Sequence, residues 1–389
     1  MASLDLETET LRQEAVKLRR NLHRHPELGF EEIRTAGIVA DYLRDLGIDT
    51  ETGVGRTGVV GKLEGVEGEG HVLIRVDMDA LPIQEETNAD YASQVPGVMH
   101  ACGHDGHTTI GLMAAKLLAR NRTGLKGQVM LVFQPAEEGL GGARAMLEDG
   151  LLTSQPSRAL ALHLWNQAPL GKVAITSGPV LASADGFKIL VSGKGGHGAV
   201  PHLANDVIVA ACQMVSAFQT ITSRSIDPME TAVLSVGKIN AGNAANVLPE
   251  RAELTGTIRT YDSGVRDLVV TRLQDIGEGI ARAMGVVFEL ELTSSTPPVV
   301  NYQAVTRIAQ DTAREMFGVE NVDEGHRIMA SEDMSLILEQ IPGCYIFLGS
   351  ANAEKGLDYP HHHPRFDFDE KALLLGAKLL AQTAADCLE

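Results

Sequence analysis

The sequence is short of basic residues for its acidic content. Its 33 Lys and Arg residues stand against 51 Asp and Glu residues, which gives a formal net charge of −18, and no Lys/Arg-rich run occurs anywhere in the chain. Nucleic acids and anionic membranes attract basic patches. The charge balance therefore argues against nucleic acid and against membrane surfaces as partners.

The sequence also has few cysteines and no long apolar run. The four cysteines are far apart and form no CxxC pair: Cys102, Cys212, Cys344 and Cys387. A disulfide framework is therefore not expected. Residues 1–20 are charged and amphipathic, without the basic-then-apolar layout of a secretion signal, and no apolar run is long enough to span a bilayer. We expect a cytoplasmic protein.

The 389 residues are 44% hydrophobic, the composition of a folded protein, and their number favours two domains over one. Several short apolar runs rich in β-branched residues alternate with helix-like segments such as 108–120. This alternation predicts an α/β fold with a mostly parallel sheet. The runs are HVLIRVDMDA (71–80), GQVMLVFQPA (127–136), ALALHLW (159–165) and CYIFLGS (344–350). The glycine-rich stretch GVEGEG (65–70) is expected to form turns.

The order of elements changes between about residues 185 and 293. There the patterns run strand, helix, strand, strand, helix, strand, which is the ferredoxin-like βαββαβ succession. We predict an inserted domain at 183–294, which interrupts a catalytic domain made of residues 1–182 and 295–389.

Polar side chains recur where the predicted parallel strands end. Ligands of open α/β sheets bind beyond the carboxyl ends of the strands, so polar residues there carry particular functional weight. Four segments deliver such residues: DMD (77–79), EE (137–138), His163 and HHH (361–363). A fifth, MHACGHDGH (99–107), directly precedes a predicted helix.

Each of these residues also has an ordinary structural explanation. His163 alone could be a hydrogen-bonded core histidine, and Glu137 and Glu138 could start a solvated helix, where acidic residues are favourable. Cys102 could be a small buried hydrophobe, and the three histidines could form an exposed loop. Their coincidence at one sheet edge favours a functional site, because burying so many ionisable groups without a cation is costly.

The residue types point to a transition-metal site. Cys102 and His104 place a thiolate and an imidazole on one loop, which favours zinc or a neighbouring first-row ion over magnesium or calcium. Glu138, His163 and a C-terminal histidine can complete the ligand set. Five ligands exceed one tetrahedral site, so two ions are the simpler interpretation. One of two adjacent glutamates can bind metal while the other takes a proton from water.

With these motifs together, the chain resembles the metal-dependent amidohydrolases that include hippurate hydrolase, bacterial N-acyl-amino-acid deacylases and plant auxin-conjugate hydrolases. That family is a branch of the aminoacylase/carboxypeptidase group of di-metal peptidases. The resemblance covers essentially the whole chain and rests on nine ordered motifs: HRHPELGFEE (23–32), DMDALPI (77–83), MHACGHDGH (99–107), QPAEEG (134–139), HLW (163–165), GKGGHGAVPH (193–202), NVLPERAELTGTIR (246–259), SEDM (331–334) and HHPRFDFDE (362–370).

The resemblance implies roles for particular residues. It makes Glu137 the general base and later the general acid. It implies two divalent ions, of zinc, manganese, cobalt or nickel. The implied metal ligands are Cys102, His104, Glu138, His163 and His362. The choice of His362 among the three histidines rests on its spacing to Pro364.

For the inserted domain, the resemblance implies a lid and a dimerisation surface. His197 is expected to polarise the scissile carbonyl, reaching the active site of a partner subunit. Asn246 and Arg259 are expected to contact the substrate, and a guanidinium suits its carboxylate. His197 could instead be an exposed turn residue, and Arg259 a surface residue. In the catalytic domain, Asp79, Asp105 and His107 are expected to orient the metal ligands.

The predicted function is metal-dependent hydrolysis of the amide bond of N-acyl amino acids by a homodimer or higher homo-oligomer. A dipeptidase or carboxypeptidase with the same mechanism is the nearest alternative. A metal-binding receptor module without catalysis is another, although a general base at position 137 has no use in a receptor. A ligand-binding protein with a ferredoxin-like sensor domain is the third.

Overall fold

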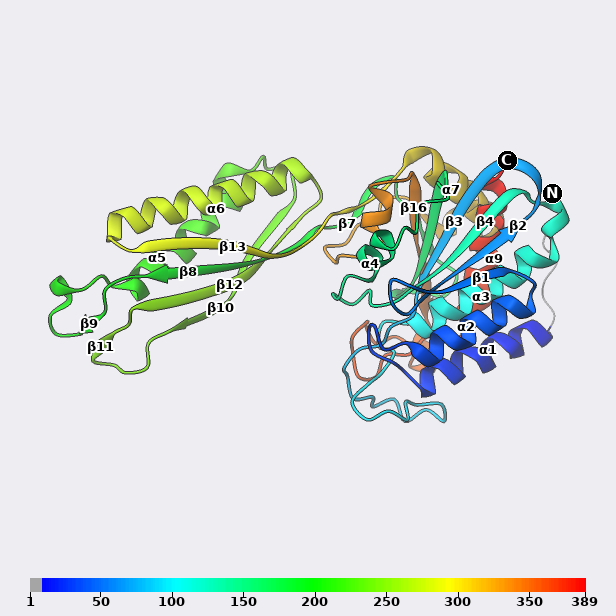
Figure 1. Cartoon of the computed structure of the whole chain (residues 1–389), viewed down its shortest axis with the longest axis horizontal. Coiled ribbons are helices and arrows are strands. Elements are labelled where there is room, and N and C mark those ends of the chain that lie inside the picture. Colours follow the sequence, from blue (N-terminus) through cyan, green and yellow to red (C-terminus); the bar gives the residue numbers. More distant parts are fainter. Residues whose placement is uncertain (1–8) are drawn as a thin grey trace. The chain divides into compact units, whose positions relative to one another are not determined.

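The computed structural model describes residues 9–389, so the first eight residues of the predicted catalytic domain and of the amphipathic N-terminal segment lie outside the described residues. The chain divides into two compact units (Figure 1). The first contains the chain through Gly178 together with Val300–His326 and Asp333–Glu389; the second contains Pro179–Val299 and Arg327–Glu332. Within residues 9–389, no helix is both long and apolar enough to cross a membrane.

The first unit is built on an eight-stranded sheet in the order β1-β2-β4-β3-β5-β16-β6-β15. The strands are β1 (Asp49–Val54), β2 (Gly58–Glu64), β3 (Val66–Asp77), β4 (Lys126–Gln134), β5 (Arg158–Pro169), β6 (Val173–Ala174), β15 (Val322–Asp323) and β16 (Gly343–Ala351). The four central strands β4, β3, β5 and β16 are parallel, whereas β1, β2 and β6 pair antiparallel. The predicted α/β fold with a mostly parallel sheet is confirmed.

Helices α3 and α9 pack on each other and on this sheet, and α1 packs outside both. The helices of the unit are α1 (Glu9–Arg24), α2 (Ile33–Asp45), α3 (His104–Arg120), α4 (Gly142–Glu148), α7 (Gln303–Phe317), α8 (Ser335–Leu338) and α9 (Ala372–Cys387). The central strands are buried almost throughout, as β16 illustrates. Covered parallel strands need apolar side chains on both faces, which explains the continuous apolar runs of the sequence.

Most of the stretch GVEGEG belongs to a strand, although the chain changes direction across it as the predicted turns imply: β2 runs antiparallel to β4 and β3 runs parallel to it. β3 begins at Val66, and its register against β4 shifts between Val66 and Gly70. A Cβ atom at Gly65 would lie 2.3 Å from the Leu125 carbonyl oxygen, and one at Gly68 would lie 2.7 Å from the backbone of Lys126. These glycines therefore permit a close approach of two backbones at the place where the chain reverses its direction between β2 and β3.

The second unit has a four-stranded antiparallel sheet in the order β10-β12-β8-β13, with a core of its own. Its main elements are β8 (Ala184–Ser192), α5 (Val207–Thr220), β10 (Ala232–Ala241), β12 (Arg251–Thr260), α6 (Ser263–Met284) and β13 (Val287–Thr296). Strands β9 (Gly196–His197) and β11 (Val247–Leu248) pair with each other, and β7 (Gly178–Leu181) and β14 (Val299–Asn301) lie where the chain passes between the units. The ferredoxin-like fold is confirmed, while the limits 183–294 and the lid role stay predictions.

Both helices of the second unit begin at an aspartate. The side chains of Asp206 and Asp262 accept hydrogen bonds from backbone N–H groups in the first turns of α5 and α6. Such caps satisfy amide groups that a helix start otherwise leaves unpaired. Gly285 ends α6 with a φ of 67°, which is typical of glycine after a helix.

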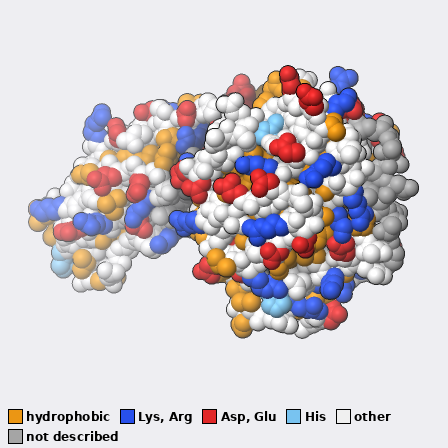
Figure 2. Space-filling model, turned by 45° about the vertical axis from the view of Figure 1, so that its right-hand side comes forward, with side chains coloured by type: hydrophobic (Ala, Val, Ile, Leu, Met, Phe, Trp, Pro, Cys, Tyr) orange, Lys and Arg blue, Asp and Glu red, His pale blue; other side chains and the backbone are white. Residues whose placement is uncertain are grey.

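On the molecular face shown in Figure 2, acidic and basic side chains are interspersed. The described side chains of this face form no continuous basic patch of the kind that binds nucleic acid.

Candidate metal centre and active site

The predicted metal ligands come from four segments at the carboxyl edge of the parallel strands. The loop before α3 carries Cys102 and the first residue of α3 is His104; the turn after β4 carries Glu138, β5 carries His163, and the segment after β16 carries His362. The structure brings all five together, because three overlapping groups each have ligand atoms within 4.8 Å of one another. These groups are Cys102 with His104 and His163, Cys102 with Glu138 and His362, and His104 with Glu137 and Glu138.

The Cys102–His104 loop is shaped by the glycine between them. Gly103 has a φ of 89°, a conformation that residues with side chains rarely adopt, and α3 begins at the next residue. His104 Nδ1 lies 3.1 Å from Asp79 Oδ1, while His104 Nε2 is buried without a hydrogen-bond partner among the described residues. The carboxylate therefore orients the ring and leaves Nε2 directed into the site, as expected for a metal ligand.

His163 presents a lone pair to the same place. Its Nδ1 lies 2.6 Å from the Leu164 carbonyl oxygen, to which it donates, and its Nε2 lies 3.5 Å from Cys102 Sγ. Burial, with further effects from His107 and His361, holds the pKa of His163 well below its usual value. His163 is therefore neutral near pH 7, which is the state that binds metal ions.

Both ring nitrogens of His107 form hydrogen bonds with other groups of the protein. Nδ1 lies 2.6 Å from Asp77 Oδ1, and Nε2 accepts a hydrogen bond of 2.9 Å from the Leu164 backbone N–H. Although His107, Asp77 and His104 are close enough to form a metal-type cluster, His107 has no lone pair left for an ion. It supports the backbone beside His163, in line with the supporting role that we predicted.

The three consecutive histidines 361–363 have different surroundings. His362 Nε2 lies 3.2 Å from Glu138 Oε1. His361 stacks on Trp165 with ring centroids 5.0 Å apart and contacts the Leu164 carbonyl through Nε2 at 2.9 Å. His363 Nδ1 accepts from the backbone N–H of Arg365, outside the cluster. His361 also contacts the ring of His163, with centroids 5.2 Å apart, but of the three it is His362 that joins a metal-type group, with Cys102 and Glu138.

A strained turn after β4 directs the two glutamates. Ala136 has a φ of 52°, and its N–H donates to the buried Glu32 carboxylate over 2.8 Å. The Glu138 N–H donates to Asp79 Oδ2 over 3.0 Å. Asp79 thus fixes both His104 and the backbone of Glu138, and the turn places Glu137 beside the cluster. Strain of this kind is concentrated at functional sites.

The residues fit a metal centre by chemistry and by electrostatics. Sulfur, imidazole and carboxylate donors form a set that zinc and its neighbours accept. Burial and the Glu138 charge raise the pKa of the Cys102 thiol, which a coordinated cation would reverse. Hydrogen bonds with Cys102 and Glu138 raise the pKa of His362 to about 10, so this position attracts positive charge. His104 Nε2, which has no hydrogen-bond partner within residues 9–389, completes the fit.

The sequence did not reveal a buried network behind Asp77. Arg75, which is 1% exposed, donates to Asp77 over 2.7 Å, to Gln134 over 2.8 Å and to Asp333 over 3.1 Å. Asp333 belongs to the SEDM motif (331–334), and it also accepts from the Ala143 N–H. Arg75 and Asp77 are two residues apart on β3, so their side chains point to the same face of the sheet. This spacing was the signal in the sequence that the two side chains could meet.

The second unit holds the remaining predicted residues in two places. His197 on β9 is exposed and pairs in register with Val247, the neighbour of Asn246, whose carbonyl accepts from the Gly198 N–H. Arg259 lies on β12, half-buried, and its Nη1 has no partner in the described part of the chain. These residues therefore lie at opposite ends of the sheet, because β12 meets the Ser192 end of β8 at Arg251.

Comparisons with known proteins add to this geometry. Residues 73–386 match the profile of peptidase family M20/M25/M40. Hippurate hydrolase from Campylobacter jejuni is 40% identical over 97% of this chain and 98% of its own, and thermostable carboxypeptidase 1 from Saccharolobus solfataricus is 40% identical over 93% and 92%. A crystal structure described as a dinuclear metal-binding peptidase from Bacillus subtilis superposes with a TM-score of 0.86 at 34% identity, covering 97% of this chain and 98% of that one.

Proposed function

Because the chain belongs to peptidase family M20/M25/M40, we propose that it is a metal-dependent amidohydrolase that cleaves N-acyl amino acids into a carboxylic acid and a free amino acid. The observation that carries the proposal is the meeting of five metal-type ligands with a further glutamate at one sheet edge. The likeness to a hippurate hydrolase over nearly the whole chain supports this substrate class.

We assign Cys102, His104, Glu138, His163 and His362 as the residues that hold two divalent ions. When bound, such ions supply Lewis-acid activation of a water molecule and of the amide carbonyl. The relative described as dinuclear supports two ions rather than one. Zinc, manganese, cobalt and nickel all suit this donor set.

Glu137 is the proton carrier in this proposal. Its carboxylate takes a proton from the attacking water as the new C–O bond forms at the carbonyl carbon. Glu137 then gives that proton to the amide nitrogen as the C–N bond breaks, which releases the amine of the amino acid. The Glu138 backbone N–H donates to Asp79, and we assign Glu138 to the metal ions and Glu137 to the proton.

The second unit supports a shared active site. Arg259 and the Arg251 end of β12 are eight residues apart, about 26 Å along a strand, and His197 lies beyond the Arg251 end. An N-acyl amino acid is far shorter than that distance. If Arg259 binds the substrate carboxylate and His197 stabilises the oxyanion, they come from different subunits. We therefore propose a homodimer or higher homo-oligomer with His197 acting in trans.

We also place the protein in the cytoplasm. All four cysteines, which lie in the described part of the chain, are free, and this supports a reducing compartment.

A carboxypeptidase is the second candidate, favoured by the likeness to a thermostable carboxypeptidase. The bond attacked is an amide in either case, so the metal cluster does not discriminate. The test is a panel of hippurate, several N-acetyl amino acids and matched dipeptides, with free amino acid measured before and after chelation. Chelator-sensitive release from the acyl substrates supports the proposal, whereas release from dipeptides alone would favour the peptidase. No release from a metal-loaded protein would contradict both.

A further inference from the structure

Two of the segments that carry predicted ligands are about 260 residues apart in sequence, and a buried arginine joins them. Arg19, on α1, is completely buried. Its Nε donates to Asp105 Oδ2 over 2.7 Å, and its Nη2 donates to Asp367 Oδ1 over 2.8 Å. Both carboxylates are buried too.

Each of these two carboxylates belongs to a chain segment that carries a predicted metal ligand. Asp105 directly follows His104 in the first turn of α3. Asp367 ends the segment that holds His362, and Asn166 closes that segment by donating to the carbonyls of Tyr359 and Asp367. The segment also meets the first loop directly, since the His362 N–H donates to the Ala101 carbonyl. Arg19 thus connects the loop that holds Cys102 and His104 with the segment that holds His362, through Asp105 and Asp367.

We propose that Arg19 is a positioning residue that fixes the distance between the Cys102–His104 loop and the His362 segment, and thereby sets the affinity for the metal ions. The inference rests on the metal site of the proposed function but not on its substrate. A planar guanidinium can serve two carboxylates in fixed directions, whereas an ammonium acts as a point charge. A buried charge of this kind is costly unless it is fully paired, which Arg19 is.

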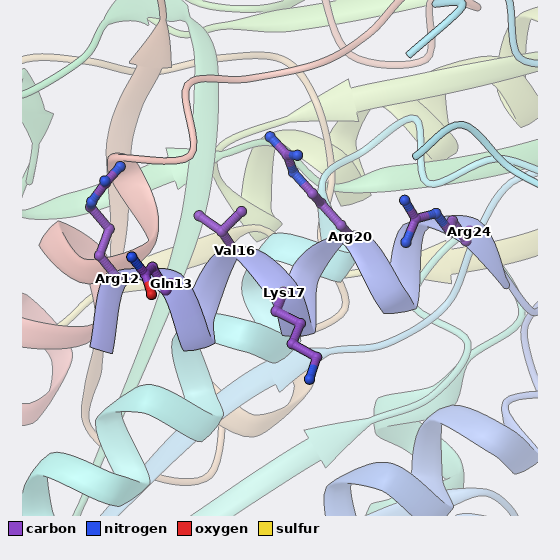
Figure 3. Close-up of a pocket in the computed structure, with 6 residues that line it drawn as sticks. All are labelled: Arg12, Gln13, Val16, Lys17, Arg20 and Arg24. Carbon is purple, nitrogen blue, oxygen red and sulfur yellow. The ribbon is translucent and has the colours of Figure 1, made fainter. Parts of the chain in front are cut away.

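Arg20, its neighbour in sequence, provides a matched control. Its side chain is 34% exposed, and it lines a hollow of about 420 Å³ together with Arg12 and Arg24 (Figure 3). Arg20 binds Glu370 through two hydrogen bonds of 2.8 Å. Arg19 and Arg20 therefore share a helix, and both pair with Glu370. Of these two guanidinium groups, it is that of Arg19 that contacts both Asp105, beside His104, and Asp367, in the segment that holds His362.

The test compares Arg19→Lys, Arg19→Met and Arg20→Lys in the full-length chain, titrated with Co²⁺ after metal removal. Binding is followed by the thiolate-to-cobalt absorption of Cys102 and by the emission of Trp165, the chain's one tryptophan, which stacks on His361. Urea unfolding of the metal-free proteins records their folding. No substrate is used, so a failure of the proposed amide hydrolysis stays distinct from a failure of this inference.

We expect Arg19→Lys to remain folded, to bind Co²⁺ about 10- to 100-fold more weakly than wild type, and to shift the absorption band. Arg20→Lys should match wild type. If Arg19→Met does not fold, the lysine pair decides the question. Unchanged cobalt affinity in folded Arg19→Lys, or an equal loss in Arg20→Lys, would overturn the inference. A wild-type chain that bound no cobalt would overturn the metal site on which it rests.

Discussion

Three adjacent histidines, 361–363, share one residue type but have three environments. His362 lies against Glu138 in the predicted cluster, His361 stacks on Trp165, and His363 accepts a hydrogen bond within its own turn. We expect His362→Ala to lose at least one of the two bound ions, measured by elemental analysis of the purified protein. His363→Ala is the matched control and should keep both. Loss of metal from His363→Ala with retention by His362→Ala would reverse the assignment.

Single residues were predictable where their type and their place in a strand both carried information. His163 stood out because it ends a predicted parallel strand, and Cys102 and His104 stood out because a thiol and an imidazole share one short loop before a predicted helix. Arg19 and Arg75 did not stand out. An arginine on an amphipathic helix or in a strand usually reaches solvent, and only the three-dimensional fold shows that these two guanidinium groups are buried among carboxylates.

Among the elements, the turn that starts α3 depends on one backbone conformation. Gly103 has a φ of 89°, and a Cβ atom there would meet Phe366 at an ordinary 3.5 Å. Gly103→Ala should therefore cost about 1–2 kcal/mol of unfolding free energy through backbone strain alone, measured by urea unfolding. Because the strain falls between Cys102 and His104, the variant should also bind metal more weakly.

Gly171→Ala is the control for this prediction. Gly171 has a φ of 86°, a Cβ atom there would have no neighbour within 4 Å, and the residue lies after β5, away from the ligand loop. The variant should lose similar stability while keeping the metal affinity of wild type. Equal metal affinity in both variants would show that the geometry of Gly103 does not matter to the site.

The four central strands and the βαββαβ order could be predicted because each buried strand needs its own apolar run. The two-residue strands β6 and β15 could not, because so short a segment has no periodicity and is defined by its neighbours. The turn at Ala136 was equally hidden. Its positive φ is held by Glu32 from a distant segment, and alanine itself gives no sign of that conformation.

In the whole molecule, the two units have separate hydrophobic cores. The predicted metal ligands all lie in the first unit. Chelation should therefore lower the melting temperature of the first unit by about 5–10 °C, since binding two ions well above their Kd stabilises the folded state by several kcal/mol. The transition of the second unit should not move. Calorimetry with and without chelator measures both, and an unchanged first transition would contradict the assignment.

The position of His197 leads to a prediction for the assembled protein. Glu137→Gln and His197→Ala should each be nearly inactive alone. If His197 acts in the site of the partner subunit, mixing and reassembling the two variants should restore about a quarter of wild-type turnover, from the one intact site of each mixed dimer. No recovery, in subunits shown to exchange, would place His197 in its own subunit's site, and an active His197→Ala alone would place it outside catalysis.

The most direct test of the proposed mechanism is the turnover of metal-loaded Glu137→Gln. The substitution keeps the size of the side chain and removes the carboxylate that carries the proton, so metal content should stay at about two ions per chain while release of amino acid from an N-acyl substrate falls about 10²- to 10⁴-fold. Near-wild-type turnover in a folded protein with both ions bound would contradict the assignment of Glu137 as the general base, and with it the mechanism proposed for this site.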